Sequence, residues 1–347
     1  MSSSPDFFSD GSSLERAMRP TARTWAKHFV YFLLTFFTAT LAGTIYPFGQ
    51  AQHPLYELNN VLDSDWYVLT LPFWFVPWLF LAAAKHLWFV FNDFTLLKQG
   101  LSFSIPLLCI LTAHEFGHYI ACRIYNVDAT LPYFIPVPLI SPAGTLGAVI
   151  KILSPMPSRK AVFDIGVAGP IAGFIALIPV AVIAFLTMEK VNPQEIVGES
   201  ELYFSDGLLI KLFALIFGYD LNFTIPNGFY FAAWIGLLIT AMNLIPSGQL
   251  DGGHALYAVF GEKIHHWTGR ISFILMALIS ITGFVVFSSP SGFLFTILLG
   301  IMLRFPHPEP LDDSPLDFKR KVIAFLTLVI FILSFVPFPI RSSTPLF

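Results

Sequence analysis

Two histidines four residues apart, with a glutamate directly after the first, are the residues of this sequence best suited to chemistry. They form the segment His114-Glu115-Phe116-Gly117-His118. On a helix, positions i and i+4 share a face, so both imidazoles can be directed at one metal ion. Glu115 would then lie beside a water molecule on the metal, where a carboxylate can take its proton and deliver it to a leaving amine. The pattern predicts a zinc site with Glu115 as general base.

The segment lies inside an apolar run, residues 103–124. Random placement of its residues would give the pattern about 0.006 times in a chain of this length. The alternative is a pair of buried histidines with an unrelated glutamate. A charged residue at the centre of a bilayer helix costs about 2.5–3.5 kcal/mol. Three polar residues in one apolar helix therefore favour a metal site over that alternative.

A catalytic zinc has three protein ligands and one open position. The leading candidate for the third ligand is Asp251, which follows another apolar run within residues 243–254. Two other uses of Asp251 stay open, as a helix cap or as a turn residue before Gly252. His254 lies one helical turn further on and is a competing candidate, or a residue that surrounds the ligands.

The elements that position these residues are expected to be membrane helices. Of the 347 residues, 55% are hydrophobic and 12% are charged, whereas soluble domains carry roughly 25% charged residues. Lipid is the natural solvent for such a surplus of apolar side chains. We expect an all-α polytopic membrane protein with six to eight transmembrane helices. The candidate runs cover residues 29–46, 69–91, 103–124, 162–188, 229–245, 271–287, 293–303 and 322–335.

The expected organisation is a disordered tail, residues 1–22, followed by a single transmembrane domain, residues 23–340, with a catalytic core at about 100–270. Basic residues before the first run could indicate a signal peptide, but its length and the later spans favour an uncleaved helix. Residues 208–217 are predicted to form a short interfacial helix. The distribution of Lys and Arg leaves the membrane topology open.

Residues 125–160 contain many Pro and Gly and few charges. Six prolines exclude a continuous helix there, and the run 146–153 is strand-like because of its β-branched residues. Irregular backbone at membrane depth is tolerated only against protein or a watery cavity. The region is therefore predicted to be a re-entrant β-hairpin-like loop, and an ordinary interfacial loop remains the alternative.

Taken together, the His-Glu-x-x-His helix, the Pro/Gly-rich region and the later Asn-x-x-Pro and Leu-Asp-Gly motifs resemble the site-2 protease family of intramembrane zinc metalloproteases. The stretches GTLGA at 144–148, AGPIAG at 168–173 and NLIPSGQLDGGH at 243–254 are most similar to its bacterial and plant-chloroplast branch. The resemblance covers roughly residues 100–270. No stretch is long enough for the PDZ or CBS domains of some members, so none is expected.

The resemblance implies that one Zn²⁺ per chain is held by His114, His118 and Asp251, with Glu115 as the catalytic base. It also implies that Asn243 contacts the substrate carbonyl or the developing oxyanion, although a buried Asn can simply bond to backbone. The glycine-containing stretch with Gly144 and Gly147 would bind an unwound substrate by strand addition, which exposes carbonyls that a helix hides.

The remaining candidates are interpreted as structural. Gly169 and Gly173 have the GxxxG spacing that permits close helix packing. His265 and His266 are expected in a solvated basic loop. Residues with no metal-binding partner nearby in the sequence are His28, His53, His86 and His307, and the two cysteines are packing thiols, Cys109 and Cys122.

The favoured hypothesis is a zinc metalloendopeptidase that acts on membrane-tethered proteins in regulated intramembrane proteolysis. A non-proteolytic zinc-binding scaffold or chaperone would be expected to lack a ligand or the Glu. A transporter would be expected to show internal repeats and polar residues on several helices. The net charge of -3, without a basic tract, argues against a nucleic-acid partner. The expected location is a multi-pass bacterial inner or cell membrane; the oligomeric state is left open.

Overall fold

The computed structural model describes residues 20–45, 47–49, 51–52, 54, 65–191, 202–305 and 307–342, with the backbone alone at 65–74 and 202. Most of the predicted tail, residues 1–19, lies outside the described residues, as does His53. The first described helix begins at Ala22, where the side chain of Thr21 accepts a hydrogen bond from the backbone N–H of Thr24. Such an N-cap satisfies one of the unpaired donors at a helix start.

The fold is predominantly helical, and the predicted all-α membrane class is confirmed. The helices in chain order are α2 (Ala22–Thr44), α4 (Asp65–Asn92), α5 (Phe94–Ile124), α6 (Arg159–Thr187), α7 (Leu208–Phe217), α8 (Gly228–Asn243), α9 (Asp251–Phe260), α10 (Glu262–Phe287), α11 (Ser291–Met302) and α12 (Phe318–Ser334). The strands are short: β1 (Tyr133–Pro136), β2 (Thr145–Val149), β3 (Glu189–Lys190), β4 (Leu202–Phe204), β5 (Thr224–Ile225) and β6 (Ile340–Ser342).

In the described part of the chain, four helices are long and apolar enough to cross a membrane: α5, α6, α10 and the Phe75–Asn92 part of α4. Helices α7, α8 and α11 are apolar but have only 10 to 17 residues. A span of about 30 Å of hydrocarbon needs about 20 helical residues. The predicted count of six to eight spans therefore stays a prediction.

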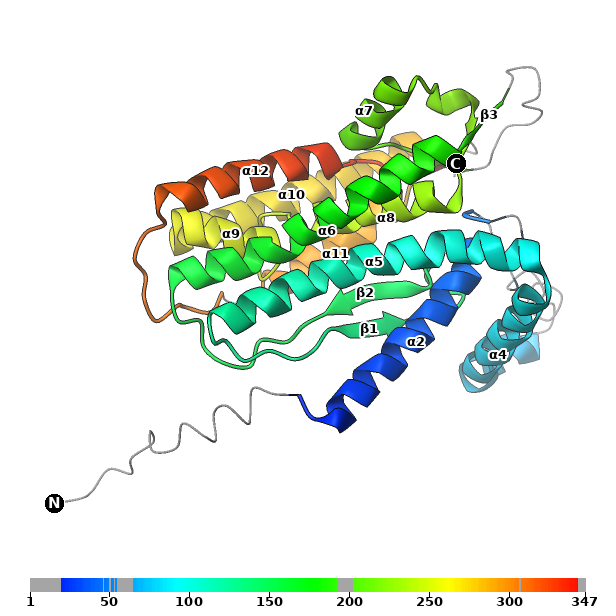
Figure 1. Ribbon diagram of the computed structural model, residues 1–347, viewed down its shortest axis with the longest axis horizontal. Coiled ribbons are helices and arrows are strands. Elements are labelled where there is room, and N and C mark those ends of the chain that lie inside the picture. Colours follow the sequence, from blue (N-terminus) through cyan, green and yellow to red (C-terminus); the bar gives the residue numbers. More distant parts are fainter. Residues whose placement is uncertain are drawn as a thin grey trace.

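Helix α5 lies at the centre of the bundle, in contact with α2, α6 and α8 (Figure 1). Helix α6 also packs against α9 and α12, so the two longest central helices touch most of the other elements. Their shared core contains Phe103 and Leu107 of α5, Leu177 of α6 and Leu237 of α8, all of them fully buried. In a membrane such contacts stabilise the bundle through close packing, because lipid is as apolar as the side chains.

The Pro- and Gly-rich region forms an antiparallel pair of strands, β1 and β2, with Phe134 opposite Ala148. The predicted strand at 146–153 is shorter in the structure, Thr145–Val149, and the sequence did not indicate β1, which ends at Pro136. The pair lies beside α2, along the same side of the bundle as α5 (Figure 1). Whether the hairpin enters the membrane stays a prediction.

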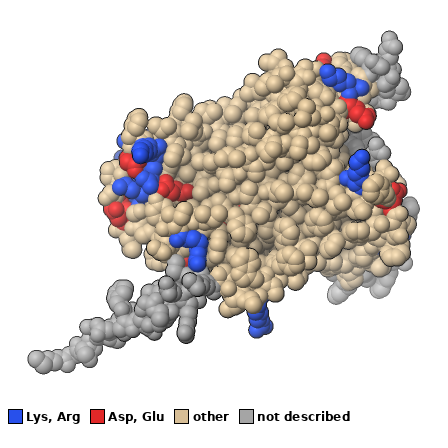
Figure 2. All heavy atoms as spheres, in the orientation of Figure 1, with Lys and Arg blue, Asp and Glu red and all other residues tan. Residues whose placement is uncertain are grey.

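On the face shown in Figure 2, most charged side chains gather at the two ends of the molecule, and a broad surface with little charge separates them. One end joins three segments that are distant in sequence. Arg159 of α6 donates to the carbonyl of Ala258 at 2.7 Å, and Arg320 of α12 pairs with Asp164 of α6 at 2.6 Å. The beginnings of α6 and α12 therefore lie together with the end of α9.

The predicted solvated loop around His265 and His266 is the first part of α10, which begins at Glu262. His265 is buried, and its Nε2–H donates to the carbonyl of Gly248 at 3.0 Å, whereas His266 is exposed. The prediction is wrong for His265. A turn at Gly261, where φ is +83°, starts the helix earlier than the charge pattern suggested and rotates His265 inward.

Candidate metal centre

Helix α5 presents His114 and His118 on one face, as their spacing predicted. Both imidazoles are buried, with side chains 4% and 8% exposed, and their ring centroids are 4.9 Å apart. The helix continues without interruption through both residues, although it contains Pro106 two turns earlier. Proline is tolerated in membrane helices where neighbouring groups compensate for the lost hydrogen bond.

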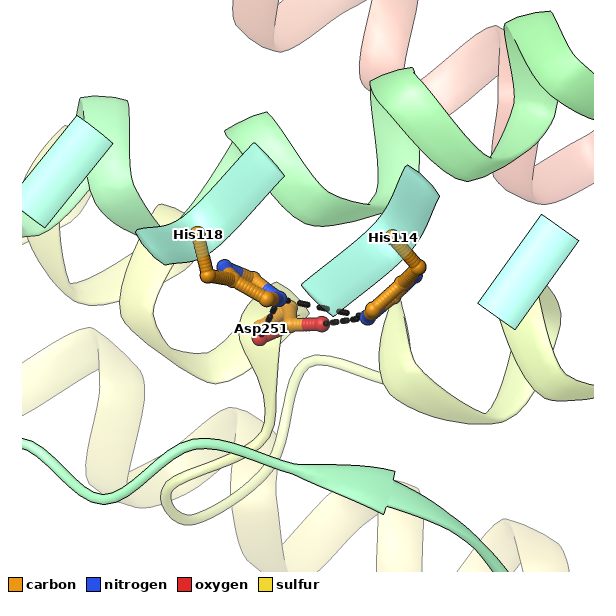
Figure 3. A group of neighbouring side chains, drawn as sticks. All are labelled: His114, His118 and Asp251. Carbon is orange, nitrogen blue, oxygen red and sulfur yellow. Dashed lines mark hydrogen bonds and ion pairs between the residues drawn. The ribbon is translucent and has the colours of Figure 1, made fainter. Parts of the chain in front are cut away.

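Asp251 is the first residue of α9 and faces the two imidazoles across the bundle (Figure 3). The loop from α8 turns back through Gly248, where φ is +55°. Glycines at 252 and 253 allow the start of α9 to lie directly against this loop, since a Cβ there would collide with loop carbonyls. The carboxylate also lies at a helix N-terminus, which favours a negative charge. The carboxylate of Asp251 points at the histidines, and its role as the third ligand stays a prediction.

The three side chains bring their donor atoms close together. Asp251 Oδ2 lies 3.3 Å from His114 Nε2, Asp251 Oδ1 lies 3.3 Å from His118 Nε2, and the two Nε2 atoms are 3.2 Å apart. Tetrahedral zinc with bonds of about 2.0–2.1 Å keeps its ligand atoms roughly 3.3 Å apart. Among the described residues, this is the one His/Cys/Asp/Glu group of three or more with metal-binding spacing. The donor set and its spacing fit a zinc ion.

The tautomer of His118 suits a ligand. Its Nδ1 lies 2.7 Å from the carbonyl oxygen of Ile165 in α6. A carbonyl only accepts, so Nδ1 carries the proton, and Nε2 of the neutral ring is left with a free lone pair. Metal-binding histidines typically use their second nitrogen in this way.

Glu115 follows His114 and lines the same pocket, where it is 6% exposed. The backbone of Ile150, just after β2, lies close enough to the Glu115 carboxylate to interact with it electrostatically. The pocket has a volume of about 210 Å³. Its lining residues are His114, Glu115, His118, Ala148, Val149, Ile150, Ile152, Ile165, Gly166, Asn243, Gln249, Leu250, Asp251 and His254. A carboxylate, the three donor groups and one edge of the hairpin thus share a cavity.

Asn243 is the last residue of α8 and also lines the pocket. Its Nδ2 lies 3.3 Å from His114 Nε2. The amide therefore borders the predicted metal site directly, within reach of a group bound beside it.

The two hairpin glycines lie outside the pocket lining. Gly144 has φ of +72° and sits against α2, where a Cβ would collide with the carbonyl of Thr38. Gly147 has φ of +95°, and nothing lies near its missing Cβ. Their neighbours Ala148 and Val149 face the cavity instead, so substrate binding by the glycines stays a prediction.

Gly169 and Gly173 of α6 were expected to serve helix packing alone. The structure places them against the two imidazoles. A Cβ at Gly169 would overlap Nε2 of His118, and a Cβ at Gly173 would lie 3.1 Å from Cβ of His114. The shared four-residue spacing of the glycine pair and the histidine pair was the available signal, since i and i+4 lie on one face of each helix.

His254 does not join the three donor groups. It lines the pocket, and its Nδ1 lies 2.7 Å from Nε2 of His307, a residue for which the sequence offered no partner. Asp251 is therefore better placed than His254 as the third ligand.

Two similar proteins are named as probable zinc metalloproteases. The probable zinc metalloprotease EGY2, chloroplastic, of Oryza sativa subsp. indica is 28% identical over 259 residues, 73% of this chain and 46% of that protein. The probable zinc metalloprotease EGY1, chloroplastic, of Arabidopsis thaliana is 29% identical over 255 residues, 71% of this chain and 45% of that protein. The chain thus spans about half the length of the curated relatives it matches.

These relatives bear on the expected location. The apolar helices identify an integral membrane protein, but the expected bacterial inner or cell membrane is not supported, since the relatives are chloroplast proteins of plants.

The profile of Peptidase family M50 matches residues 102–283, more than half of the chain. The matched range includes the histidine pair, Glu115 and Asp251. This family is the site-2 protease family, so the resemblance found in the motifs is confirmed. The chain belongs to Peptidase family M50.

Proposed function

We propose that this chain is an intramembrane zinc metalloendopeptidase that hydrolyses peptide bonds of membrane-tethered proteins. The observation that carries the proposal is the group of three donor residues, with atoms 3.2–3.3 Å apart, beside a buried glutamate in an apolar helix bundle. Family membership and the names of the relatives, probable zinc metalloproteases, support the reaction and the metal.

In this proposal His114, His118 and Asp251 hold the zinc ion. Bound zinc supplies Lewis acidity, which brings the pKa of a water molecule toward neutrality and polarises the scissile carbonyl. The Ile165 carbonyl orients the ring of His118 by accepting from Nδ1–H. Gly169 leaves room for that ring, so α6 contributes to the site without providing a ligand.

Glu115 acts as the general base. Its carboxylate removes a proton from the attacking water and delivers it to the nitrogen of the departing amine. The nearby backbone of Ile150 places the carboxylate beside the end of β2. The amide of Asn243 donates a hydrogen bond to the substrate carbonyl oxygen, where negative charge develops.

The substrate binds as an extended strand along the hairpin that carries Gly144 and Gly147. Strand β2 pairs with β1 on one edge, and the residues just after Gly147 line the pocket. A helical substrate hides its scissile carbonyl in its own hydrogen bonds, and pairing as a strand releases it. The uncharged middle of the surface (Figure 2) suits a substrate that arrives through lipid.

The test uses the full chain purified in detergent. Zinc content is measured by plasma mass spectrometry, and cleavage is measured on a tagged single-span reporter protein reconstituted in the same phospholipid vesicles. Glu115→Gln is expected to retain one zinc per chain and to lose cleavage by at least about 1000-fold, because the water keeps its proton. The matched control is Glu189→Gln, at an exposed glutamate of β3, which should cleave at the normal rate. Equal cleavage by wild type and Glu115→Gln would remove Glu115 from its role.

A further inference from the structure

Behind the proposed metal site, two histidines from distant parts of the chain form a hydrogen bond. Nδ1 of His254, one turn after Asp251 in α9, lies 2.7 Å from Nε2 of His307. His254 also lines the pocket that contains Glu115. His307 belongs to the segment between α11 and α12. The proposed reaction uses neither residue.

The contact between His307 and Pro308 determines which ring nitrogens of the two histidines carry protons. Nδ1 of His307 is 2.9 Å from the carbonyl oxygen of Pro308. Since a carbonyl only accepts, Nδ1 of His307 carries a proton, and Nε2 of the neutral ring is an acceptor. Nδ1 of His254 must then be the donor to His307.

Packing holds His307 in this orientation and keeps it neutral. Its ring stacks on Tyr257, with centroids 4.0 Å apart and planes 9° from parallel. His265 lies on another side, at a centroid distance of 5.1 Å, and is itself fixed by the Gly248 carbonyl. Burial, together with the nearby rings of His254 and His265, lowers the pKa of His307 to about 3. A proton on both nitrogens of His307 is therefore disfavoured at neutral pH.

The proton on Nδ1 leaves Nε2 of the neutral His254 ring with an open lone pair. Within the described part of the chain, the hydrogen bond to His307 is the only one that the side chain of His254 makes. Free histidine prefers the other neutral tautomer, with the proton on Nε2, so His307 reverses the ordinary preference. The pocket consequently contains a hydrogen-bond acceptor that is not one of the three metal-binding side chains.

We propose that His254 is a substrate-positioning residue whose unprotonated Nε2 accepts a hydrogen bond from a backbone N–H of the bound peptide. His307 fixes this tautomer of His254 by accepting a hydrogen bond from its Nδ1–H. The inference rests on the proposed proteolytic function. The occupant of this subsite is a peptide N–H, because a bare imidazole nitrogen only accepts and a backbone N–H is the donor that every extended peptide presents. In the proposed reaction three polar side chains of the pocket hold the metal, Glu115 acts on water and Asn243 on a carbonyl oxygen, and Gln249 is the one further polar side chain of the lining.

The first test reads the tautomer without any cleavage assay. Nitrogen-15 NMR of full-length protein labelled at histidine distinguishes protonated from bare ring nitrogens, and His254→Gln assigns the signals. At pH 7 the His254 signals should show Nδ1 protonated and Nε2 bare. In His307→Phe the preference should reverse toward Nε2–H. Protonated Nε2 in the wild type would overturn the inference, whether or not the protein cleaves the reporter.

The second test uses two substitutions of His307 with the reporter cleavage assay. Phe keeps a ring against Tyr257 but cannot accept from His254, whereas Gln restores an acceptor. His307→Phe is expected to raise KM by about 5- to 10-fold with little change in kcat, which is the loss of about one hydrogen bond in substrate binding. His307→Gln should recover most of that loss. Zinc content should stay at one per chain in both variants.

The controls separate positioning from general damage. His266→Gln, at the exposed histidine next to His265, should leave KM unchanged. In a His254→Ala background, His307→Phe should add nothing further, because the two residues act as a unit. If His307→Phe and the wild type both cleave the reporter with the same KM, this inference is overturned and the proposed function is left intact. Absence of any cleavage by wild type would instead count against the proposed function.

Discussion

Two polar clusters connect the central helices. They differ in whether the protein itself supplies all the partners of their polar groups. At the charged end of the molecule, Arg320 of α12 donates from Nε to Asp164 Oδ1 at 2.9 Å and from Nη2 to Asp164 Oδ2 at 2.6 Å. It also donates to Tyr125 at 3.0 Å and pairs with Asp317. In the interior, His114, His118 and Asp251 bring together two ring nitrogens and two carboxylate oxygens.

The end cluster is complete within the protein. One guanidinium meets the carboxylate of Asp164 in a two-point contact, and both side chains are about a quarter exposed, at 23% and 26%. Such a bidentate pair needs no further partner. It contributes only modestly to the stability of the fold, because water still reaches it. The cluster connects α12 to α6 and to Tyr125, the residue directly after α5.

The inner cluster is deeper and is made mainly of acceptors. His118 Nδ1–H is already committed to the Ile165 carbonyl, so its Nε2 faces Asp251 and His114 as a lone pair. No Lys or Arg lines the pocket. A buried group of acceptors needs a cation to be stable. An unbalanced charge, rather than polarity alone, therefore distinguishes the inner cluster as a binding site from the self-contained ion pair at the end of the molecule.

The largest expected effect comes from removing an inner donor. His118→Ala should reduce zinc content to near zero and cleavage by at least about 1000-fold, since two remaining ligands do not hold a catalytic zinc. Zinc per chain and reporter cleavage are measured together. If the variant kept a full zinc and normal cleavage, the contrast between the two clusters would lose its basis.

A smaller effect is expected from the glycines that make room for the imidazoles. The added methyl group of Gly169→Ala overlaps the His118 ring, whereas that of Gly173→Ala lies 3.1 Å from His114 Cβ and needs only a small shift. Gly169→Ala should weaken zinc binding by about 10- to 100-fold, and Gly173→Ala by less. Competition with a chromogenic chelator gives both affinities. The reverse order would contradict the placement of α6 against α5.

The smallest effect on the reaction is expected at the end cluster. Arg320→Ala should lower stability by about 1–3 kcal/mol, because the partly buried Asp164 loses its charged partner and keeps only the Tyr125 hydroxyl as donor. Thermal unfolding in detergent measures this loss. Zinc content and cleavage below the unfolding range should stay within about twofold of wild type. The neighbouring exposed Lys319→Ala serves as the control and should leave the melting temperature unchanged. Loss of zinc in Arg320→Ala would mean that the end cluster also supports metal binding, which contradicts the expected difference between the two clusters.

The residues that the sequence located correctly are those whose geometry is local. His114 and His118 are four apart on a helix, so helical periodicity alone placed both imidazoles on one face. Asp251 is 133 positions after His118. Its place after an apolar run made it the leading candidate and the resemblance to a known family supported it, but no local spacing could place its carboxylate. The domain bounds and the roles of the site residues remain predictions.

What the sequence did not indicate depends on contacts between distant segments. The pairing of His254 with His307 joins α9 to a proline-containing segment for which no periodic pattern exists. Strand β1 was missed because four residues ending in Pro136 give too short a pattern, and the strand is stabilised by its partner β2 and by α2. Burial of His265 follows from where α10 begins, and helix starts are among the least predictable features.

The most direct test of the central claim is X-ray absorption spectroscopy at the zinc edge of the purified full-length protein. We expect one zinc per chain with two imidazole nitrogens and otherwise oxygen ligands at about 2.0–2.1 Å, and loss of the bound zinc in Asp251→Ala. A zinc ion with three imidazoles, with a sulfur ligand, or with an unchanged spectrum in Asp251→Ala would contradict it.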